Sequence, residues 1–244
     1  MIDLILPPLL LSIVLLLIHS YYGLQIIKRN IIFTDLAVGQ MAALGVAVSL
    51  YLFEGKFLYP ISLLLAVLTA ILIAYISHKE KSLQEAFIGL IYALGMSGVF
   101  IVMSKSPHGL EELNNLLAYD ILFTSYNEIF KVSILYLIIG LFLYFVVRNT
   151  QGFLKDILFF TTFAITLTSS VKLAGVLVVF SILIAPSLIS LKLFSKNHLI
   201  YATITGFILI LISLTLSYNF DLPTGYTIVF INSLSALTTI LIKK

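Results

Sequence analysis

The sequence predicts an all-α membrane protein, a polytopic helix bundle with eight or nine transmembrane helices. The first observation is composition: the 244 residues are 61% hydrophobic and 10% charged, with a mean hydropathy of +1.14. That leaves too little charge to cover the surface of a soluble domain. The second observation is that the apolar residues form many separate segments of membrane-spanning length. The alternating ten-residue pattern of an outer-membrane barrel is absent.

Nine apolar segments are candidate helices, and together they predict a single transmembrane domain over residues 1–244. The first segment lacks the basic start and A-x-A-like site of a signal peptide, so it is interpreted as a span. The sixth is short, and Lys172 alone separates it from the seventh, which leaves the count at eight or nine. The segments cover residues 2–19, 31–53, 58–77, 86–104, 127–147, 154–169, 172–194, 199–218 and 225–242.

The connections between these segments sort by charge, which predicts their side of the membrane. Basic residues follow the first, third, fifth, seventh and ninth segments, and most acidic residues lie in the other connections. The positive-inside rule places the basic set in the cytoplasm, with the N-terminus outside and the C-terminus inside. The basic set is Lys28, Arg29, Lys79, Lys81, Arg148, Lys155, Lys192, Lys196, Lys243 and Lys244.

Two connections invite a functional interpretation. The only long one, residues 104–126, contains SPHGLEELNNLL, in which Ser106 and Pro107 are typical of a helix N-terminus. It predicts an amphipathic helix at the membrane surface, a docking surface for an external partner, or both. The short connection RNTQGFLKD, residues 148–156, is either a turn at Gly152 or a segment that presses on a cytoplasmic partner.

Missing motifs favour transport or conduction over catalysis. With no cysteine, the chain has no disulfide, thiolate metal site or cysteine nucleophile. It has no nucleotide-binding P-loop, no H-E-x-x-H, no G-x-S-x-G and no G-x-G-x-x-G. A net charge of +3 gives no reason to expect nucleic-acid binding. We therefore expect a protein that is not an enzyme, needs no cofactor and carries out no covalent chemistry.

The second predicted helix holds the polar groups that most need an explanation. Its segment FTDLAVGQMAALG contains Asp35 and Gln40 among small residues, which let helix backbones approach closely in lipid. A carboxylate within a span is costly unless it faces water or a partner. Asp35 either faces a substrate path or is stabilised by the helix N-terminus, and Gln40 lines the path or bonds to a neighbouring helix. His19, near the inner end of the first helix, could pair with Asp35.

Four segments resemble the integral-membrane permeases of metal-ion ABC importers, the ABC-3 type family. They are HSYYGLQIIKRNIIFTDLAVGQMAALGVAV, EAFIGLIYALG, VKLAGVLVVFSILIAPSLISLKLF and SYNFDLPTGYTIV, in that order along most of the chain. The resemblance implies a permease in the cell membrane that takes up zinc, manganese or iron. It also implies a pore of two permease copies, a separate cytoplasmic ATPase and an external solute-binding protein. The segment RNTQGFLKD falls where the family contacts its ATPase, although here it is shortened, which makes Arg148, Gln151, Gly152 and Lys155 candidate coupling residues.

This sequence departs from the family pattern at the opening of its second helix. Similar permeases carry Asp and His four residues apart, with Gly five residues after the His. Alignment on Gly45 puts Gln40 at the His position, whereas alignment on Asp35 puts Gly39 there. A spacing of five turns two side chains about 140° apart on a helix, so Asp35 and Gln40 cannot chelate one ion together. Asp35 is therefore the metal candidate, and Gln is a poor zinc ligand.

Two alternatives to a metal-ion permease remain open. The sparse polar lining of the spans would also suit a permease for a metal chelate or a corrinoid. A protein of another class, an ATP-independent carrier or channel, would need neither an ATPase nor a solute-binding protein. The genes next to this one would distinguish these classes, since an importer requires both partners.

Overall fold

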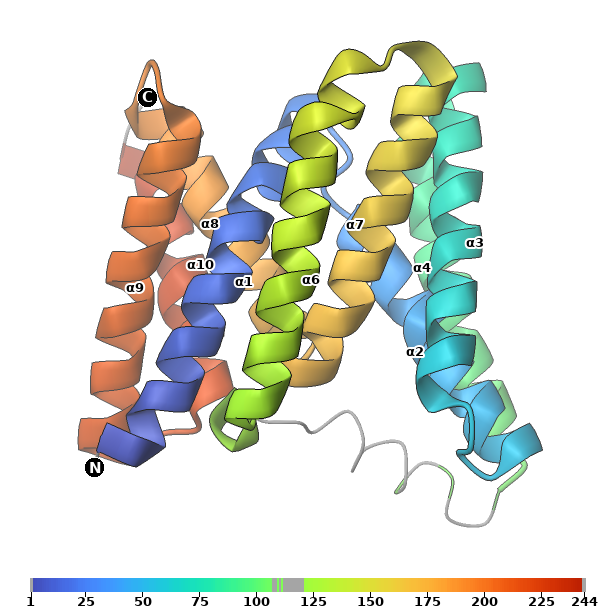
Figure 1. Cartoon of the computed structure of the whole chain (residues 1–244), viewed down its shortest axis with the longest axis horizontal. Helices are drawn as coiled ribbons and strands as arrows, with labels where there is room; N and C mark the ends of the chain where they lie inside the picture. The colour runs from blue at the N-terminus through green and yellow to red at the C-terminus, as the bar shows by residue number, and fades with distance from the viewer. Residues whose placement is uncertain (1, 107–108, 110, 112–120, 243–244) are drawn as a thin grey trace. The chain divides into compact units, whose positions relative to one another are not determined.

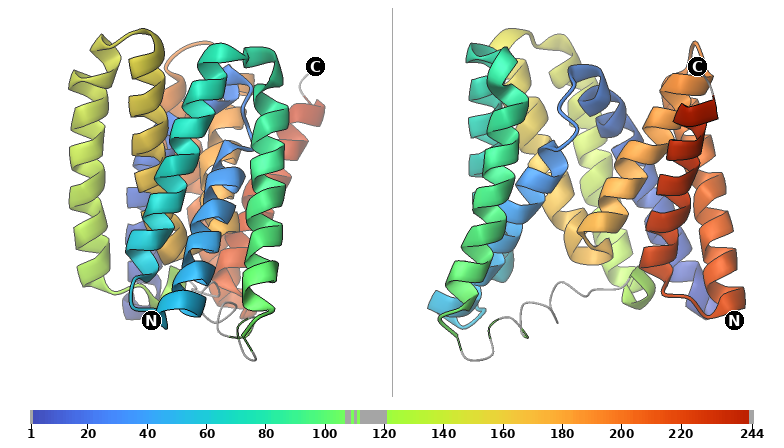
Figure 2. Two further views of the ribbon diagram at one scale, coloured as in Figure 1. Left: turned by 90° about the vertical axis from the view of Figure 1, so that its right-hand side faces the viewer. Right: turned by 180° about the vertical axis from the view of Figure 1, so that it is seen from behind.

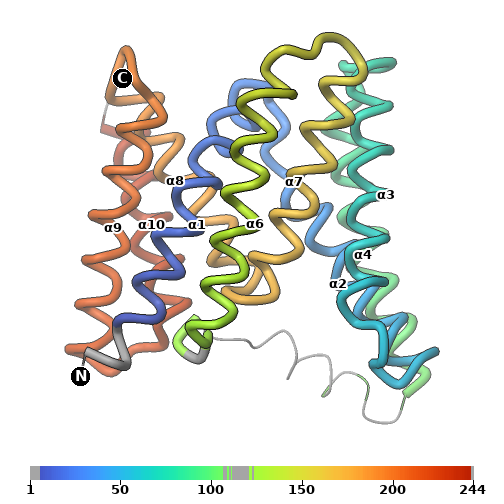
Figure 3. The backbone as a smooth tube through the Cα atoms, viewed as in Figure 1, coloured from blue at the N-terminus to red at the C-terminus, as the bar shows by residue number. Residues whose placement is uncertain are grey.

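The computed structural model describes residues 2–106, 109, 111 and 121–242, and these form helices joined by short connections (Figure 1; Figure 3). Nine α-helices in this part of the chain are long and apolar enough to cross a membrane, which confirms the all-α class. The chain divides into two compact units. Unit 1 comprises residues 1–32, 119–137 and 173–244, and unit 2 comprises residues 33–118 and 138–172. The single domain inferred from the sequence stays a prediction.

Unit 1 is built around α8, which packs against three other helices of the unit, α1, α9 and α10. The views of Figure 2 show these four helices side by side. Their bounds are α1 (Ile2–Arg29), α8 (Val176–Leu193), α9 (His198–Phe220) and α10 (Thr224–Ile242). Unit 1 also contains the 3-10 helix η2 (Ile121–Phe123) and the first part of α6 (Tyr126–Phe145). The segment of α8 is thus the centre of unit 1, which explains its run of small and apolar residues.

Close backbone contacts hold α1 and α9 against α8. A Cβ atom added at Gly23 of α1 would overlap the carbonyl oxygen of Leu183, so only glycine permits this crossing. Nearby, the Ser187 hydroxyl donates a hydrogen bond to the carbonyl oxygen of Ser20, at 3.4 Å. A Cβ at Gly206 of α9 would overlap Cδ1 of Leu16 in α1 and lie 3.0 Å from Cγ of Pro186 in α8. Small residues let these helices approach closely, as expected for packing in lipid.

Unit 2 is built in the same way around α2, which packs against α3 and α4 (Figure 2, left). A Cβ at Gly45 would lie 2.6 Å from Cα of Ser62 in α3, and one at Gly95 in α4 would lie 3.0 Å from Cβ of Gln40. The small residues predicted to pack α2 are all buried: Ala37, Gly39, Ala42, Ala43, Gly45 and Ala47. The three helices are α2 (Thr34–Phe53), α3 (Leu58–Lys79) and α4 (Gln84–Met103). Unit 2 also contains the 3-10 helices η1 (Lys81–Leu83) and η3 (Val147–Asn149), the last part of α6 and most of α7 (Gly152–Ala174).

Helix α1 extends ten residues beyond the predicted end at residue 19. The polar residues after that point suggested a connection, but His19, Ser20 and Tyr22 are fully buried inside unit 1. The helix ends instead at Lys28 and Arg29, where basic side chains interact favourably with the helix C-terminus. His19 therefore lies well inside α1, and its predicted place near the inner end of the helix is wrong.

The boundary between the sixth and seventh predicted helices also differs from the structure. Helix α7 runs through Lys172 to Ala174, so it is a full span of 23 residues instead of a short one. The chain turns at Gly175, whose φ of 82° and ψ of 156° strongly favour glycine. Lys172 lies in the last turn of α7, where a cation suits the helix C-terminus. The surface helix predicted in SPHGLEELNNLL falls largely outside the described residues.

Candidate functional site

Asp35 lies in the first turn of α2 and is almost completely buried, with 2% of its surface exposed. Its Oδ1 atom has no hydrogen-bond partner among the described residues. The position fits stabilisation of an anion by the helix N-terminus. That effect is worth about 0.3–1 kcal/mol at exposed positions, whereas a charge in a span costs about 2.5–3.5 kcal/mol on insertion scales. The helix N-terminus alone therefore does not offset the cost of an ionised Asp35 carboxylate, which also accepts hydrogen bonds from the backbone N–H groups of Leu36 and of Asp35 itself.

Gln40 lies at the contact between α2 and α4. Its Cβ and backbone carbonyl carbon are the atoms that approach Gly95 most closely, and its side chain is half-buried. Gln40 and Asp35 are five residues apart on one continuous helix, so their side chains leave it about 140° apart. The geometry agrees with the expectation that the two do not chelate one ion together. A role for Gln40 in the substrate path stays a prediction.

His19 lies inside unit 1. Its Nδ1 atom is 2.8 Å from the carbonyl oxygen of Leu15 in the preceding turn of α1, which identifies Nδ1 as the protonated nitrogen. Its ring meets that of Tyr136 edge to face, with the centroids 6.3 Å apart. Because Asp35 belongs to unit 2, the suggested pairing of His19 with Asp35 stays a prediction.

The predicted coupling residues occupy the turn between α6 and α7 and the start of α7. The Arg148 guanidinium lies 5.4 Å from the centre of the Tyr144 ring, and Gly152 begins α7 with a φ of 63°. Gln151 and Gly152 are exposed, and Lys155 is half-buried. This turn is thus accessible to a partner and is held at its α6 end by the contact of Arg148 with Tyr144.

A contact within unit 2 joins this turn to the end of α3. The rings of His78 and Phe153 lie with their centroids 5.3 Å apart, a tilted arrangement. His78 is in the last turn of α3, and Phe153 follows Gly152 directly. Nothing in the sequence predicts this pair, because the two residues are 75 positions apart and neither belongs to a motif.

Glu85 is the residue that sequence reasoning missed. It lies in the first turn of α4, and its carboxylate accepts a hydrogen bond from the backbone N–H of Phe33, next to the start of α2. Its Oε2 atom is buried and has no hydrogen-bond partner among the described residues. Its place directly before the apolar AFIGL segment could have drawn attention to it, since Asp35 stands in the same way at the start of α2. Within the described residues, no three or more His, Cys, Asp and Glu side chains gather as a metal site.

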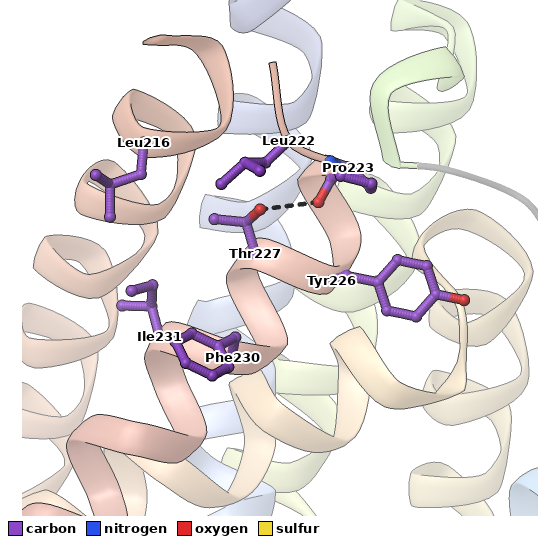
Figure 4. Close-up of a pocket in the computed structure, with 7 residues that line it drawn as sticks. All are labelled: Leu216, Leu222, Pro223, Tyr226, Thr227, Phe230 and Ile231. Carbon is purple, nitrogen blue, oxygen red and sulfur yellow. Dashed lines mark hydrogen bonds between the residues drawn. The ribbon is translucent and has the colours of Figure 1, made fainter. Parts of the chain in front are cut away.

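A hollow of about 310 Å³ lies on unit 1, away from these polar residues (Figure 4). It is formed where α9 turns into α10 and is almost wholly apolar. Thr227 and Tyr226 bring its only side-chain hydroxyls, and that of Thr227 donates to the carbonyl oxygen of Pro223 at 2.9 Å. The lining residues are Leu216, Leu222, Pro223, Tyr226, Thr227, Phe230 and Ile231. This hollow offers no ligand for a cation and is not the candidate site.

Nine helices among the described residues are long and apolar enough to cross a membrane, which defines a multi-pass membrane protein. The sequence model of the ABC 3 transport family matches residues 1–243, so the chain belongs to that family. A relative from Chlamydia trachomatis, named "Probable metal transport system membrane protein", is 25% identical over 91% of this chain and 83% of its own length.

Two solved structures share the fold. One is PsaBC from Streptococcus pneumoniae in complex with Fab, with a TM-score of 0.69, 18% identity, and coverage of 97% of this chain and 90% of that chain. The other is described as an inward-facing ABC transporter of the metal-chelate type, with a TM-score of 0.71, 16% identity, and coverage of 97% and 85%. The architecture of the described residues is therefore that of an ABC transporter permease.

Proposed function

We propose that this protein is the permease subunit of an ATP-binding-cassette importer that moves a divalent metal ion, zinc, manganese or iron, across the cell membrane. Membership of the ABC 3 transport family and the metal-transport relative support the class of substrate. The single observation that carries the proposal within the chain is Asp35. It is a carboxylate buried in a span, with an oxygen that no described residue satisfies, and a permeating cation would supply the missing charge.

The proposal includes partners that supply energy and substrate. The chain has no P-loop, so ATP would bind and be hydrolysed on a separate cytoplasmic ATPase. The exposed turn with Arg148, Gln151, Gly152 and Lys155 would contact that ATPase, on the side that the positive-inside rule assigns to the cytoplasm. An external solute-binding protein would deliver the ion, and a second copy of the permease would complete the path.

The first experiment is purification in detergent with identification of the proteins that co-elute. It is followed by ATPase measurements with manganese, zinc and iron. We expect an ATPase subunit to co-elute and one ion to stimulate it. If no ATPase binds while the permease stays folded, the importer assignment is wrong and a carrier or channel is favoured.

The role of Asp35 is tested by metal uptake in cells that produce the complete importer. We expect Asp35→Asn to lower uptake at least about tenfold. A tenfold decrease corresponds to a loss of about 1.4 kcal/mol of stabilisation of the ion, and this is less than the cost of an unpaired charge in a span. Glu54→Gln is the matched control, since that carboxylate is exposed in the connection after α2. Normal uptake by Asp35→Asn at equal membrane levels would contradict the proposed role.

A second candidate substrate is a metal chelate, as the description of one structural neighbour suggests. Uncharged residues dominate the spans, which would suit a larger and partly apolar cargo. Stimulation of the ATPase by a chelate but by no free ion would favour this alternative, and Asp35 would then be structural.

A further inference from the structure

Two connections of unit 2 lie at the same end of that unit (Figure 2, left). One is the turn between α6 and α7, which carries the proposed coupling residues, and the other is the connection between α3 and α4, residues 79–83. The rings of His78 and Phe153 join the two connections, with their centroids 5.3 Å apart. Both connections carry residues of the basic set that the positive-inside rule assigns to the cytoplasm. They are therefore assigned to the side on which an ATPase would bind.

Hydrogen bonds at both ends hold the α3–α4 connection in one shape. The backbone N–H of Glu80 donates to the carbonyl oxygen of Ile76 at 2.8 Å, and that of Leu83 donates to the carbonyl oxygen of Glu80 at 3.0 Å. The side-chain amide of Gln84 donates to the hydroxyl of Ser77, which ties the start of α4 to the end of α3. A partner would therefore meet a preformed surface, and binding would not have to order a loop.

The exposed side chains of this connection combine an apolar residue with charges of both signs. Residues 79–83 are all exposed, and 59% of the surface of Leu83 is accessible. The charged residues that precede it are Lys79, Glu80 and Lys81. Protein–protein interfaces have an apolar centre and a polar rim, whereas a site for anionic lipid is a cluster of basic residues, in which Glu80 would be unfavourable. The composition thus favours a protein partner.

The α6–α7 turn alone is too small for a stable interface. A specific interface buries about 800 Å² on each partner, from about 20–30 residues. The turn exposes only a few, which are Arg148, Asn149, Gln151, Gly152, Phe153 and Leu154. An ATPase that binds this turn must therefore contact further surface. The contact of His78 with Phe153 joins the turn directly to the exposed α3–α4 connection, and Leu83 would extend the apolar surface of Phe153 and Leu154.

We propose that the α3–α4 connection, residues 79–83, forms part of the docking surface for the cytoplasmic ATPase together with the α6–α7 turn, with Leu83 as its apolar contact. The inference rests on the proposed function, because it requires an ATPase partner. It deepens that function by naming a second docking element, which no motif in the sequence marks. The contact of His78 with Phe153 holds the two elements together, so that they bind the ATPase as one surface.

The first test places a photoreactive benzoylphenylalanine at single positions of the full-length permease, in membranes of cells that also produce the ATPase. We expect illumination to join position 83 to the ATPase, as it should position 151 in the α6–α7 turn. Position 52 is the matched control, since Leu52 is 62% exposed but lies in the last turn of α2, before a connection that the charge rule places outside. Position 83 would overturn the proposal if it linked only to lipid, or to nothing, while position 151 linked to the ATPase.

A second test measures how much Leu83 contributes to the affinity for the purified ATPase, with the permease in nanodiscs. Leu83→Ser should weaken binding about tenfold, since burial of a leucine side chain is worth at least that factor. Folding should not change, because Leu83 is exposed. Leu199→Ser is the matched control: Leu199 is 45% exposed in the first turn of α9, in unit 1, and its replacement should leave binding within about twofold. Equal affinity of wild type and Leu83→Ser would contradict the proposal.

Position 151 and co-elution of the ATPase separate this inference from the proposed function. If the ATPase co-elutes and links to position 151 but not to position 83, the extended docking surface is wrong and the importer assignment stands. If no ATPase co-elutes with folded wild-type permease and neither position links to it, the proposed function itself is wrong.

Discussion

Units 1 and 2 both bury polar atoms without hydrogen-bond partners, but the chemistry of those atoms differs. In unit 1 they are neutral: the hydroxyls of Ser12 and Ser20 and the amide oxygen of Asn232. In unit 2 they include the carboxylates of Asp35 and Glu85. A neutral group left without a partner costs about 1–3 kcal/mol, whereas an unpaired charge costs much more. The unsatisfied buried atoms described in unit 1 are therefore neutral, whereas those in unit 2 include the carboxylate that the proposed function uses.

The contacts of the other polar side chains in unit 1 support a structural role. Ser217 donates to the carbonyl oxygen of Leu222 and bonds to the hydroxyl of Thr224, which closes the turn between α9 and α10. Asn232 of α10 donates to the hydroxyl of Ser181 of α8 at 3.3 Å. Each of these bonds joins or caps helices of the same unit, as polar side chains do between membrane helices.

The largest effect expected is the loss of folded protein when a methyl group is added at Gly23. Gly23→Ala would force α1 away from the backbone of α8, because the new Cβ overlaps the Leu183 carbonyl oxygen. Overpacking of this kind costs about 1–3 kcal/mol or more. The matched control is Gly140→Ala in α6, where a Cβ meets nothing within 4 Å and alanine favours the helix. Fluorescence-detected size-exclusion chromatography after a temperature series should show a lower midpoint for Gly23→Ala only. Equal midpoints would mean that the two helices can separate without cost.

A second prediction compares one buried polar group from each unit. Asp35→Asn should leave the thermal midpoint unchanged or raise it, since it removes an unpaired buried charge, while metal uptake falls. Asn232→Leu, which removes the hydrogen bond to Ser181 from a buried position, should lower stability by about 1–3 kcal/mol and leave uptake within about twofold. Thermal stability in detergent and uptake in cells measure the two properties separately. The contrast between the units would fail if Asn232→Leu abolished uptake in stably folded protein.

The smallest effect is expected at the contact between His78 and Phe153. Aromatic pairs contribute about 0.5–1.5 kcal/mol beyond their buried area. Because this contact would position the proposed coupling turn, its loss in Phe153→Ala should lower metal-stimulated ATP hydrolysis by about two- to tenfold. Folding should change little, because Phe153 is 36% exposed. Leu154→Ala is the control, since Leu154 is the exposed neighbour. Equal ATPase rates for the two variants would mean that the contact does not position the proposed coupling turn.

The sequence alone was sufficient for the architecture at the level of spans. Nine apolar segments become nine helices in the described part of the chain, because the cost of placing unpaired backbone groups in lipid leaves a helix as the available conformation. The small residues of α2 likewise predicted close packing, which the contacts of Gly45 and Gln40 confirm. These properties depend on the residues of one segment and their transfer into lipid, so they can be read locally.

Only the tertiary structure decided which polar residues share a neighbourhood. His19, Ser20 and Tyr22 have the composition of a helix end, yet burial within unit 1 keeps them inside α1. Glu85 resembles any acid at the start of a helix until its hydrogen bond to Phe33 places it beside the start of α2. The physical reason is that the state of a polar group depends on the partners that other helices bring to it. Those partners are set by helix packing and register, which hydropathy along a single segment does not encode.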